Sequence, residues 1–141
     1  MRGGAPIFRT LRVVWMAMVG GTLFYTLVAY ALLVMDVIDV DSSFGPEVMN
    51  YVGAFAVAQI VVSLVVRRRL VAATPPGASQ EERMNHYFTA CVVTLALIEG
   101  GGLFVITFSI ITGVATWALV GGGAAVVVMI VARPLQSELE G

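Results

Sequence analysis

Four long apolar runs constrain the fold of this chain more than any other feature of its sequence. They occupy about residues 13–35, 48–66, 87–112 and 114–131. A helix that crosses a bilayer needs about 20 apolar residues, and each run reaches that length or falls just short of it. Membrane-spanning strands are a poor alternative, because they show short alternating segments rather than unbroken runs. The sequence therefore predicts an all-α bundle of four transmembrane helices that forms a single membrane domain.

The charged residues predict how this bundle is oriented. The chain contains no lysine, and its eight arginines precede the first run, follow the last run or lie in the loop predicted at 67–86. The opposite side of the predicted bundle carries Asp36, Asp39, Asp41 and Glu47. Because basic residues stay in the cytoplasm, we expect a multi-pass protein of the inner (plasma) membrane with both termini cytoplasmic. Arginines beside a helix end are typical of topology or lipid-headgroup contact, so the expected partner is the lipid bilayer and not nucleic acid.

Turn and capping signals mark the ends of the predicted helices. Pro75-Pro76-Gly77 cannot continue a helix, and the spacing of Ser79 and Glu82 fits a capping box. We therefore expect the third helix to begin near Gln80, and Gly113 to separate it from the fourth. The first run is too long for a typical signal-peptide core, which favours a retained membrane helix.

The third run contains one carboxyl group, at Glu99, followed directly by three glycines. A carboxyl group at the centre of a membrane helix costs roughly 2.5–3.5 kcal/mol on insertion scales. Loss of water favours its neutral, protonated form. Because an apolar residue would be cheaper for packing, we interpret Glu99 as an ion-binding or proton-relay residue. The alternative is a protonated glutamate that only hydrogen-bonds a neighbouring helix.

Several small and polar residues lie at about the same predicted depth as Glu99, counted at 1.5 Å per residue from the inner helix ends. A side-chain amide can donate to a buried acid, so Gln59 is the first predicted partner of Glu99, with Thr22 and Tyr25 as further candidates. Small residues let helices approach closely. The predicted helix-packing residues are Gly20, Gly21, Gly53, Gly100, Gly101, Gly102, Gly121, Gly122 and Gly123.

Short matching segments indicate an internal repeat. Gly20-Gly21-Thr22-Leu23-Phe24 aligns with Gly100-Gly101-Gly102-Leu103-Phe104, and Val52-Gly53 aligns with Val120-Gly121. Two parallel helical hairpins would produce this pattern. Glycine-rich apolar sequence also aligns by chance, so both interpretations stay open.

The residues around Glu99 resemble a known family. Leu95-Ala96-Leu97-Ile98-Glu99, followed by Gly102-Leu103-Phe104-Val105-Ile106, resembles the acid-bearing helix of the proteolipid (c) subunits of rotary ATPases. Those subunits are helical hairpins with a polar cytoplasmic loop and an ion-binding carboxylate on the second helix. The resemblance covers about residues 53–112 and implies that Glu99 binds and releases a proton or a sodium ion.

The chain also departs from that family. Its second run lacks the family's dense alternating glycines, its loop is longer, and an extra helix precedes and follows the hairpin. A diverged relative that acts alone, a ring subunit and convergence are all compatible with this pattern.

Other chemistry is sparse in this sequence. His86 is the single histidine and Cys91 the single cysteine, and neither belongs to a metal-ligand pattern, so no metal or cofactor is expected. No second titratable group is predicted near Glu99 to share acid–base work, so the chain is not expected to be an enzyme. Two functions remain. The first is ion translocation through Glu99, within a homo-oligomer or a larger membrane complex. The second is a non-catalytic accessory subunit of such a complex.

Overall fold

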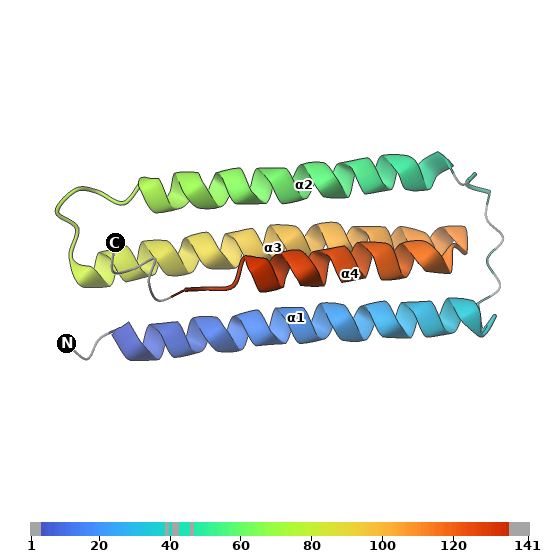
Figure 1. The fold of residues 1–141 in the computed structure, drawn as a ribbon, viewed down its shortest axis with the longest axis horizontal. Helices are drawn as coiled ribbons and strands as arrows, with labels where there is room; N and C mark the ends of the chain where they lie inside the picture. The colour runs from blue at the N-terminus through green and yellow to red at the C-terminus, as the bar shows by residue number, and fades with distance from the viewer. Residues whose placement is uncertain (1–3, 39, 41–42, 46, 136–141) are drawn as a thin grey trace.

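The computed structural model describes residues 4–38, 40, 43–45 and 47–135, and this part of the chain is helical with no strand. Four helices run back and forth along one long axis, as Figure 1 shows. They are α1 (Gly4–Val34), α2 (Glu47–Ala72), α3 (Gln80–Thr112) and α4 (Ala115–Val131). The predicted all-α class is confirmed over these residues.

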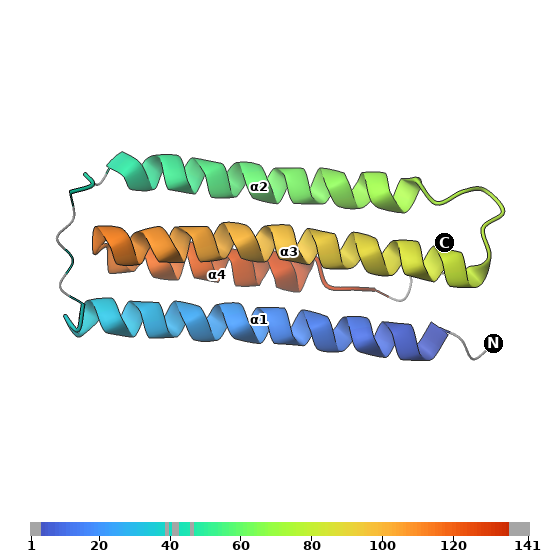
Figure 2. The ribbon, with the colours of Figure 1, turned by 180° about the vertical axis from the view of Figure 1, so that it is seen from behind.

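The helices form three layers. α3 and α4 lie together in the middle, with α1 against one side and α2 against the other, and the reverse view shows the same order (Figures 1 and 2). α3 packs against all three other helices, whereas α1 and α2 do not touch each other. The two predicted hairpins are therefore packed differently, because α3 and α4 form a close pair and α1 and α2 are separated by that pair.

Three helices extend beyond the apolar runs that predicted them. α1 begins at Gly4 rather than near residue 13, and α2 continues to Ala72 rather than 66. α3 begins before its apolar run, at Gln80, where the capping signal predicted. Arginine has a high helix propensity, so the arginine triplet does not end α2. The predicted loop 67–86 is thereby narrowed to residues 73–79. Hydrophobicity locates the membrane boundary, and a helix can cross that boundary without ending there.

Local chemistry sets both ends of α3 where the sequence predicted. The Ser79 hydroxyl accepts from the Glu82 N–H at 3.3 Å, and Glu82 Oε2 accepts from the Ser79 N–H at 2.8 Å, which confirms the capping box. The Ser79 N–H and, at 3.0 Å, the Ser79 hydroxyl both donate to Glu82 Oε2, and these two bonds, the backbone one first, hold the pKa of the Glu82 carboxyl below its usual value. At the other end of α3, Gly113 adopts a left-handed conformation with φ of 72°, which glycine tolerates best.

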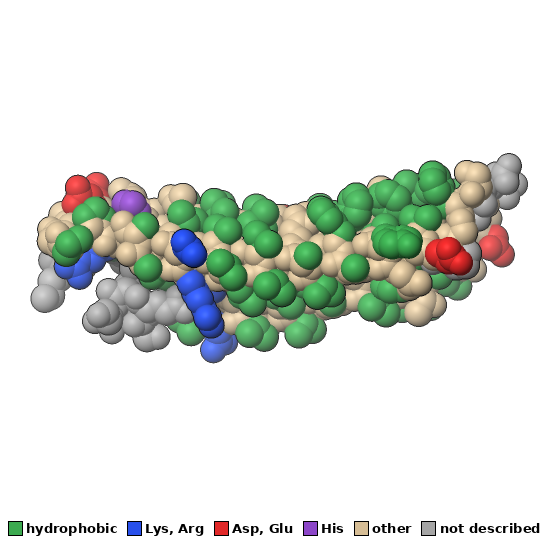
Figure 3. Space-filling view, turned by 90° about the horizontal axis from the view of Figure 1, so that it is seen from above, with side chains coloured by type: hydrophobic (Ala, Val, Ile, Leu, Met, Phe, Trp, Pro, Cys, Tyr) green, Lys and Arg blue, Asp and Glu red, His purple; other side chains and the backbone are tan. Residues whose placement is uncertain are grey.

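The composition of the helices suggests a membrane protein. α1, α2 and α3 are each long and apolar enough to cross a bilayer, whereas α4, with 17 residues, is apolar but shorter. Apolar side chains cover much of the outer surface in Figure 3, and those of Phe24, Phe55 and Val127 are among the exposed ones. A soluble monomer rarely exposes large contiguous apolar surfaces, so this surface fits a lipid environment.

Charge is divided between the two ends of the bundle. The described arginines belong to the end at which α1 and α3 begin, where they are Arg9, Arg12, Arg67, Arg68, Arg69, Arg83 and Arg133. Asp36 and Glu47 lie at the opposite end, while Glu81 and Glu82 share the arginine end. Arg2, Asp39 and Asp41, which entered the predicted orientation, lie outside the described residues.

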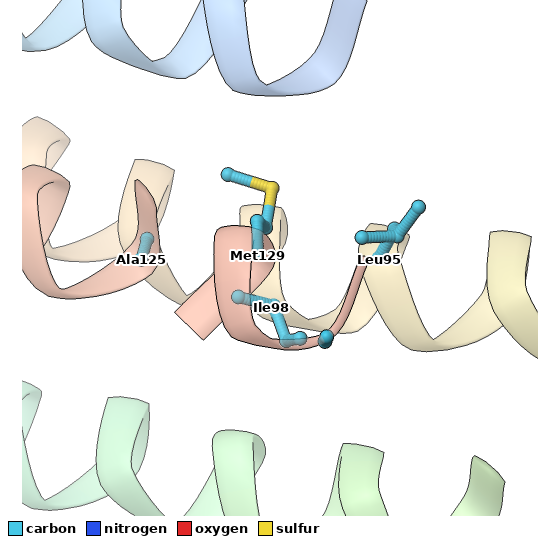
Figure 4. Close-up of a cluster of buried hydrophobic side chains, with 5 residues drawn as sticks. Leu95, Ile98, Ala125 and Met129 are labelled. Carbon is cyan, nitrogen blue, oxygen red and sulfur yellow. The ribbon is translucent and has the colours of Figure 1, made fainter. Parts of the chain in front are cut away.

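The middle layer is closely packed. Leu95 and Ile98 of α3 meet Ala125 and Met129 of α4 in a buried cluster (Figure 4). A Cβ added at Gly102 would lie 2.5 Å from the Cβ of Ala125, so this crossing requires a glycine. Close packing here fixes α3 and α4 relative to each other.

Candidate functional site

Glu99 lies on α3 with its carboxyl group directed toward α1. The Thr22 hydroxyl donates to Glu99 Oε1 over 3.4 Å, which is longer than a typical O–H···O bond. Thr22 is fully buried, whereas Glu99 is half-buried. No described residue donates to the second carboxyl oxygen, Oε2. The site is therefore a carboxyl group with one weakly held oxygen and one oxygen without a donor in the described part of the chain.

The Thr22 hydroxyl differs from the other buried serine and threonine hydroxyls in the described part of the chain. Each of the others donates to a backbone carbonyl of its own helix: Thr26, Ser63, Thr94, Ser109 and Thr112. Such bonds satisfy the donor locally and link nothing else. Thr22 instead donates across a helix interface to a titratable group. This difference marks Thr22 as a member of the site rather than a packing residue.

The predicted pairing of Gln59 with Glu99 is not the contact that forms. Gln59 approaches α3 from the α2 side, where its Nε2 and Oε1 each lie 3.4 Å from the Cβ positions of Gly100 and Gly101 respectively. Thr22 approaches α3 from the α1 side, and α1 and α2 flank opposite sides of the middle layer. No hydrogen bond between Gln59 and Glu99 is present in the described structure. Gln59 and Thr22 both lie near α3, as their equal predicted depth implies, but depth alone does not determine which face of α3 each residue contacts.

Tyr25, the third predicted partner, lies further along α1. It packs against a buried cluster formed by Ala29, Ile106 and Ala118. No hydrogen bond joins its hydroxyl to Glu99 among the described residues. Of the three candidates, the structure brings Thr22 to the carboxyl group.

The predicted packing glycines divide into two groups. Six lie against another helix: Gly53 under the Trp117 ring, Gly100 and Gly101 against Gln59, Gly102 against Ala125, Gly121 against Val105 and Gly122 against Thr26. The Cβ positions of Gly20, Gly21 and Gly123 have no atom of another part of the chain within 4 Å. A glycine in an apolar run therefore does not by itself predict a helix contact, because the angular position of the neighbour decides it.

Three side chains hold the end of α4 and the residues just after it. The sequence did not predict these contacts. The Trp15 indole N–H donates to the Met129 carbonyl at 2.8 Å, and the Arg67 guanidinium donates to the Ala132 carbonyl at 2.9 Å. The Tyr87 hydroxyl and the Leu135 backbone exchange bonds of 3.0 and 3.1 Å. The last carbonyls of a helix lack partners within the helix, so α1 and α2 satisfy two carbonyls at this end, while α3 holds the segment just after it at Leu135.

The remaining reactive residues do not join the site. His86 is exposed near the start of α3, and Cys91 is buried at the interface with the first turns of α1. No group of histidine, cysteine or acidic residues suited to a metal ion is present in the described part of the chain.

No known protein family matches the chain, and no characterised protein and no solved structure matches it either. The function is therefore inferred from the residues around Glu99, and the resemblance to proteolipid subunits stays a prediction.

Proposed function

We propose that this chain is an integral membrane protein in which Glu99 binds and releases a proton or a sodium ion during ion translocation or relay. One observation carries the proposal: a half-buried carboxyl group lies within the apolar helix α3 and is met by the buried hydroxyl of Thr22. Ionisable side chains inside a membrane are expensive and mark ion and proton pathways. The unengaged Oε2 is the atom at which a proton or ion would arrive.

Thr22 is suited to both charge states of this carboxyl group. A hydroxyl can donate to an ionised carboxylate, and by rotation it can accept from a protonated one. Thr22 therefore supports Glu99 in either state without introducing a charge of its own. A lysine or arginine in its place would hold the carboxylate ionised and oppose protonation.

We propose that all four helices cross the inner (plasma) membrane, with both termini in the cytoplasm. The support is the charge division, since the described arginines share one end of the bundle and Asp36 and Glu47 the other. The span of α4 is about 26 Å at 1.5 Å per residue, slightly less than the hydrocarbon thickness of about 30 Å. Trp15 and Arg67 would satisfy its inner end at that depth.

We also propose, as an inference about origin, that the chain descends from two parallel hairpins. The two aligned glycine segments lie on α1 and α3, which run in the same direction, as a parallel duplication requires. The two hairpins are packed unequally, and only the second has an acid at the aligned position, where the first has Val19. In this proposal both differences arose after the duplication.

The experiment is ion flux in sealed vesicles that contain the purified protein. Under an imposed pH gradient or sodium gradient, the wild-type chain is expected to conduct, and Glu99→Gln to lose that flux while assembling normally. Glu47→Gln is the matched control, because Glu47 is an exposed acid outside the site. Equal flux in the wild type and Glu99→Gln would remove the proposal.

A second function is favoured by a separate feature of the surface. A groove of about 260 Å³ runs between α2 and α4, and Gly102 and Val105 of α3 contribute to its lining. Such a groove, lined by small residues, would suit a non-catalytic subunit of a larger membrane complex or a homo-oligomer. In that case Glu99→Gln would be silent, and the protein would copurify with a larger assembly.

A further inference from the structure

Two contacts between α1 and α4 bracket Thr22 along α1. We propose that Trp15 and Gly122 are positioning residues that hold the Thr22 hydroxyl against Glu99, so that α4 sets the geometry of a site it does not enter. This inference rests on the proposed role of Glu99, and it concerns how the site is assembled.

The first contact lies two turns before Thr22. The Trp15 indole N–H donates to the Met129 carbonyl at 2.8 Å, a well-formed bond between α1 and the last turn of α4. Trp15 also packs beside the buried cluster of Leu95, Ile98 and Met129. The ring and the bond together restrict both sliding and rotation of α1 along α4.

The second contact lies one turn after Thr22. Thr26 packs directly onto Gly122, so that an added Cβ would overlap the Thr26 hydroxyl and lie 2.7–2.8 Å from its Cγ2 and Cβ. The same Thr26 hydroxyl donates to the Thr22 carbonyl at 2.7 Å. Gly122 therefore allows a close approach of the very turn of α1 that carries Thr22.

The separation of Thr22 and Glu99 makes this placement matter. At 3.4 Å the hydroxyl is near the limit of hydrogen bonding, so a shift of less than 1 Å breaks the contact. Glu99 is carried by α3, which is packed against α4 through Gly102 and Ala125. α4 thus contacts both helices of the site and, together with the direct packing of α1 on α3, holds their relative position.

The test measures the rate at which a carbodiimide labels Glu99 in the purified, detergent-solubilised full-length protein. Thr22→Val removes the donor and keeps the shape, and it is expected to change the rate by about two- to tenfold, the range that corresponds to one hydrogen bond. Trp15→Phe and Gly122→Ala are each expected to reproduce at least half of that change on a logarithmic scale. Gly123→Ala is the matched control and is expected to leave the rate unchanged, because its Cβ position faces open space.

Double variants separate positioning from a general loosening of the fold. If Trp15 acts through Thr22, Trp15→Phe has no further effect on the labelling rate in the Thr22→Val background. An unchanged rate in both Trp15→Phe and Gly122→Ala overturns the inference, and so does an equal effect of Trp15→Phe with and without Thr22. If one of these two variants does not fold, an unchanged labelling rate in the other overturns the inference by itself.

The labelling result is independent of ion flux. Absent flux in the wild type with coupled labelling would overturn the proposed function and leave the positioning of Thr22 intact. Flux that depends on Glu99, together with a labelling rate that does not change in Trp15→Phe or Gly122→Ala, would support the proposed function and overturn the positioning role of these two residues.

Discussion

The Thr22 hydroxyl lies 3.4 Å from Glu99 Oε1 and connects α1 to α3 through a buried donor and a half-buried acid. Through this contact Glu99 has a polar neighbour, which a carboxyl group surrounded only by lipid would lack. The contact also distinguishes Thr22 from the other buried serine and threonine residues of the described chain, whose hydroxyls bond within their own helices. The neutral hydroxyl of Thr22 can accompany either charge state of the carboxyl group.

Thr22→Val should alter Glu99 without unfolding the protein. Valine keeps the shape of threonine but cannot donate, so the unfolding free energy should fall by no more than about 1.5 kcal/mol. The pH dependence of carbodiimide labelling at Glu99 should change at the same time. Thr94→Val is the matched control, because the equally buried Thr94 bonds only to the Ala90 carbonyl and should leave the labelling profile as in the wild type. Identical profiles for the two variants would show that Thr22 has no particular link to Glu99.

Gly102→Ala and Gly20→Ala should have opposite effects on stability. The new Cβ at position 102 would lie 2.5 Å from that of Ala125, and overpacking of this kind typically costs about 1–3 kcal/mol. Position 20 faces open space, and alanine is the better helix former by about 1 kcal/mol. Thermal unfolding in detergent should therefore rank Gly20→Ala at or above the wild type and Gly102→Ala below it. The reverse order would mean that α3 and α4 are not packed as described.

Arg67 should contribute more to stability than its neighbour Arg68. Arg67 donates to the Ala132 carbonyl at the end of α4, where a positive charge also meets the negative end of the helix dipole. Arg67→Gln should lower the unfolding free energy by about 1–2 kcal/mol through the loss of this charged bond. Arg68→Gln removes the same charge from an exposed position and controls for any effect on topology. Equal melting temperatures of the two variants would contradict the capping role.

The first turn of α3 should loosen in acid. The hydrogen bonds from Ser79 lower the pKa of Glu82 in the folded state, so their contribution is fully present above the ordinary glutamate value of 4.5. That contribution is lost as the pH falls from about this value through the lower pKa of the folded state. Protection of the Ser79 amide from exchange should disappear in this range in the wild type but not in Glu82→Gln, whose side-chain oxygen can still accept but does not titrate. Protection of the Ser79 amide that is independent of pH in the wild type, or that falls equally in Glu82→Gln, would contradict the role of Glu82.

Features that depend on local sequence could be predicted, and the bounds of α3 are the clearest case. The Ser79–Glu82 spacing and Gly113 act within one turn of the chain, so their consequences follow from the residues alone. The position of Glu99 inside an apolar helix also follows from one charge in an apolar run. α2, by contrast, continues past the predicted membrane boundary, because its end depends on helix propensity and on Pro75 rather than on hydrophobicity.

Features that depend on how helices face each other could not be predicted. Gln59 and Thr22 have similar predicted depths, and only the layer order of the helices decides that Thr22 meets Glu99. The same applies to Gly122 and Gly123, adjacent residues of which one packs on Thr26 and the other faces open space. The hydrogen bond from Trp15 to the Met129 carbonyl could not be predicted either. The last carbonyls of α4 need donors, but these donors can come from any neighbouring helix.

Ion flux through Glu99 tests the central claim most directly. Wild-type protein and Glu99→Gln would be reconstituted at equal density in sealed vesicles, with native mass measurement to establish that both form the same assembly. The account predicts flux down a proton or sodium gradient for the wild type and none above the protein-free background for Glu99→Gln. Equal flux for the two proteins, or none for either, would contradict it.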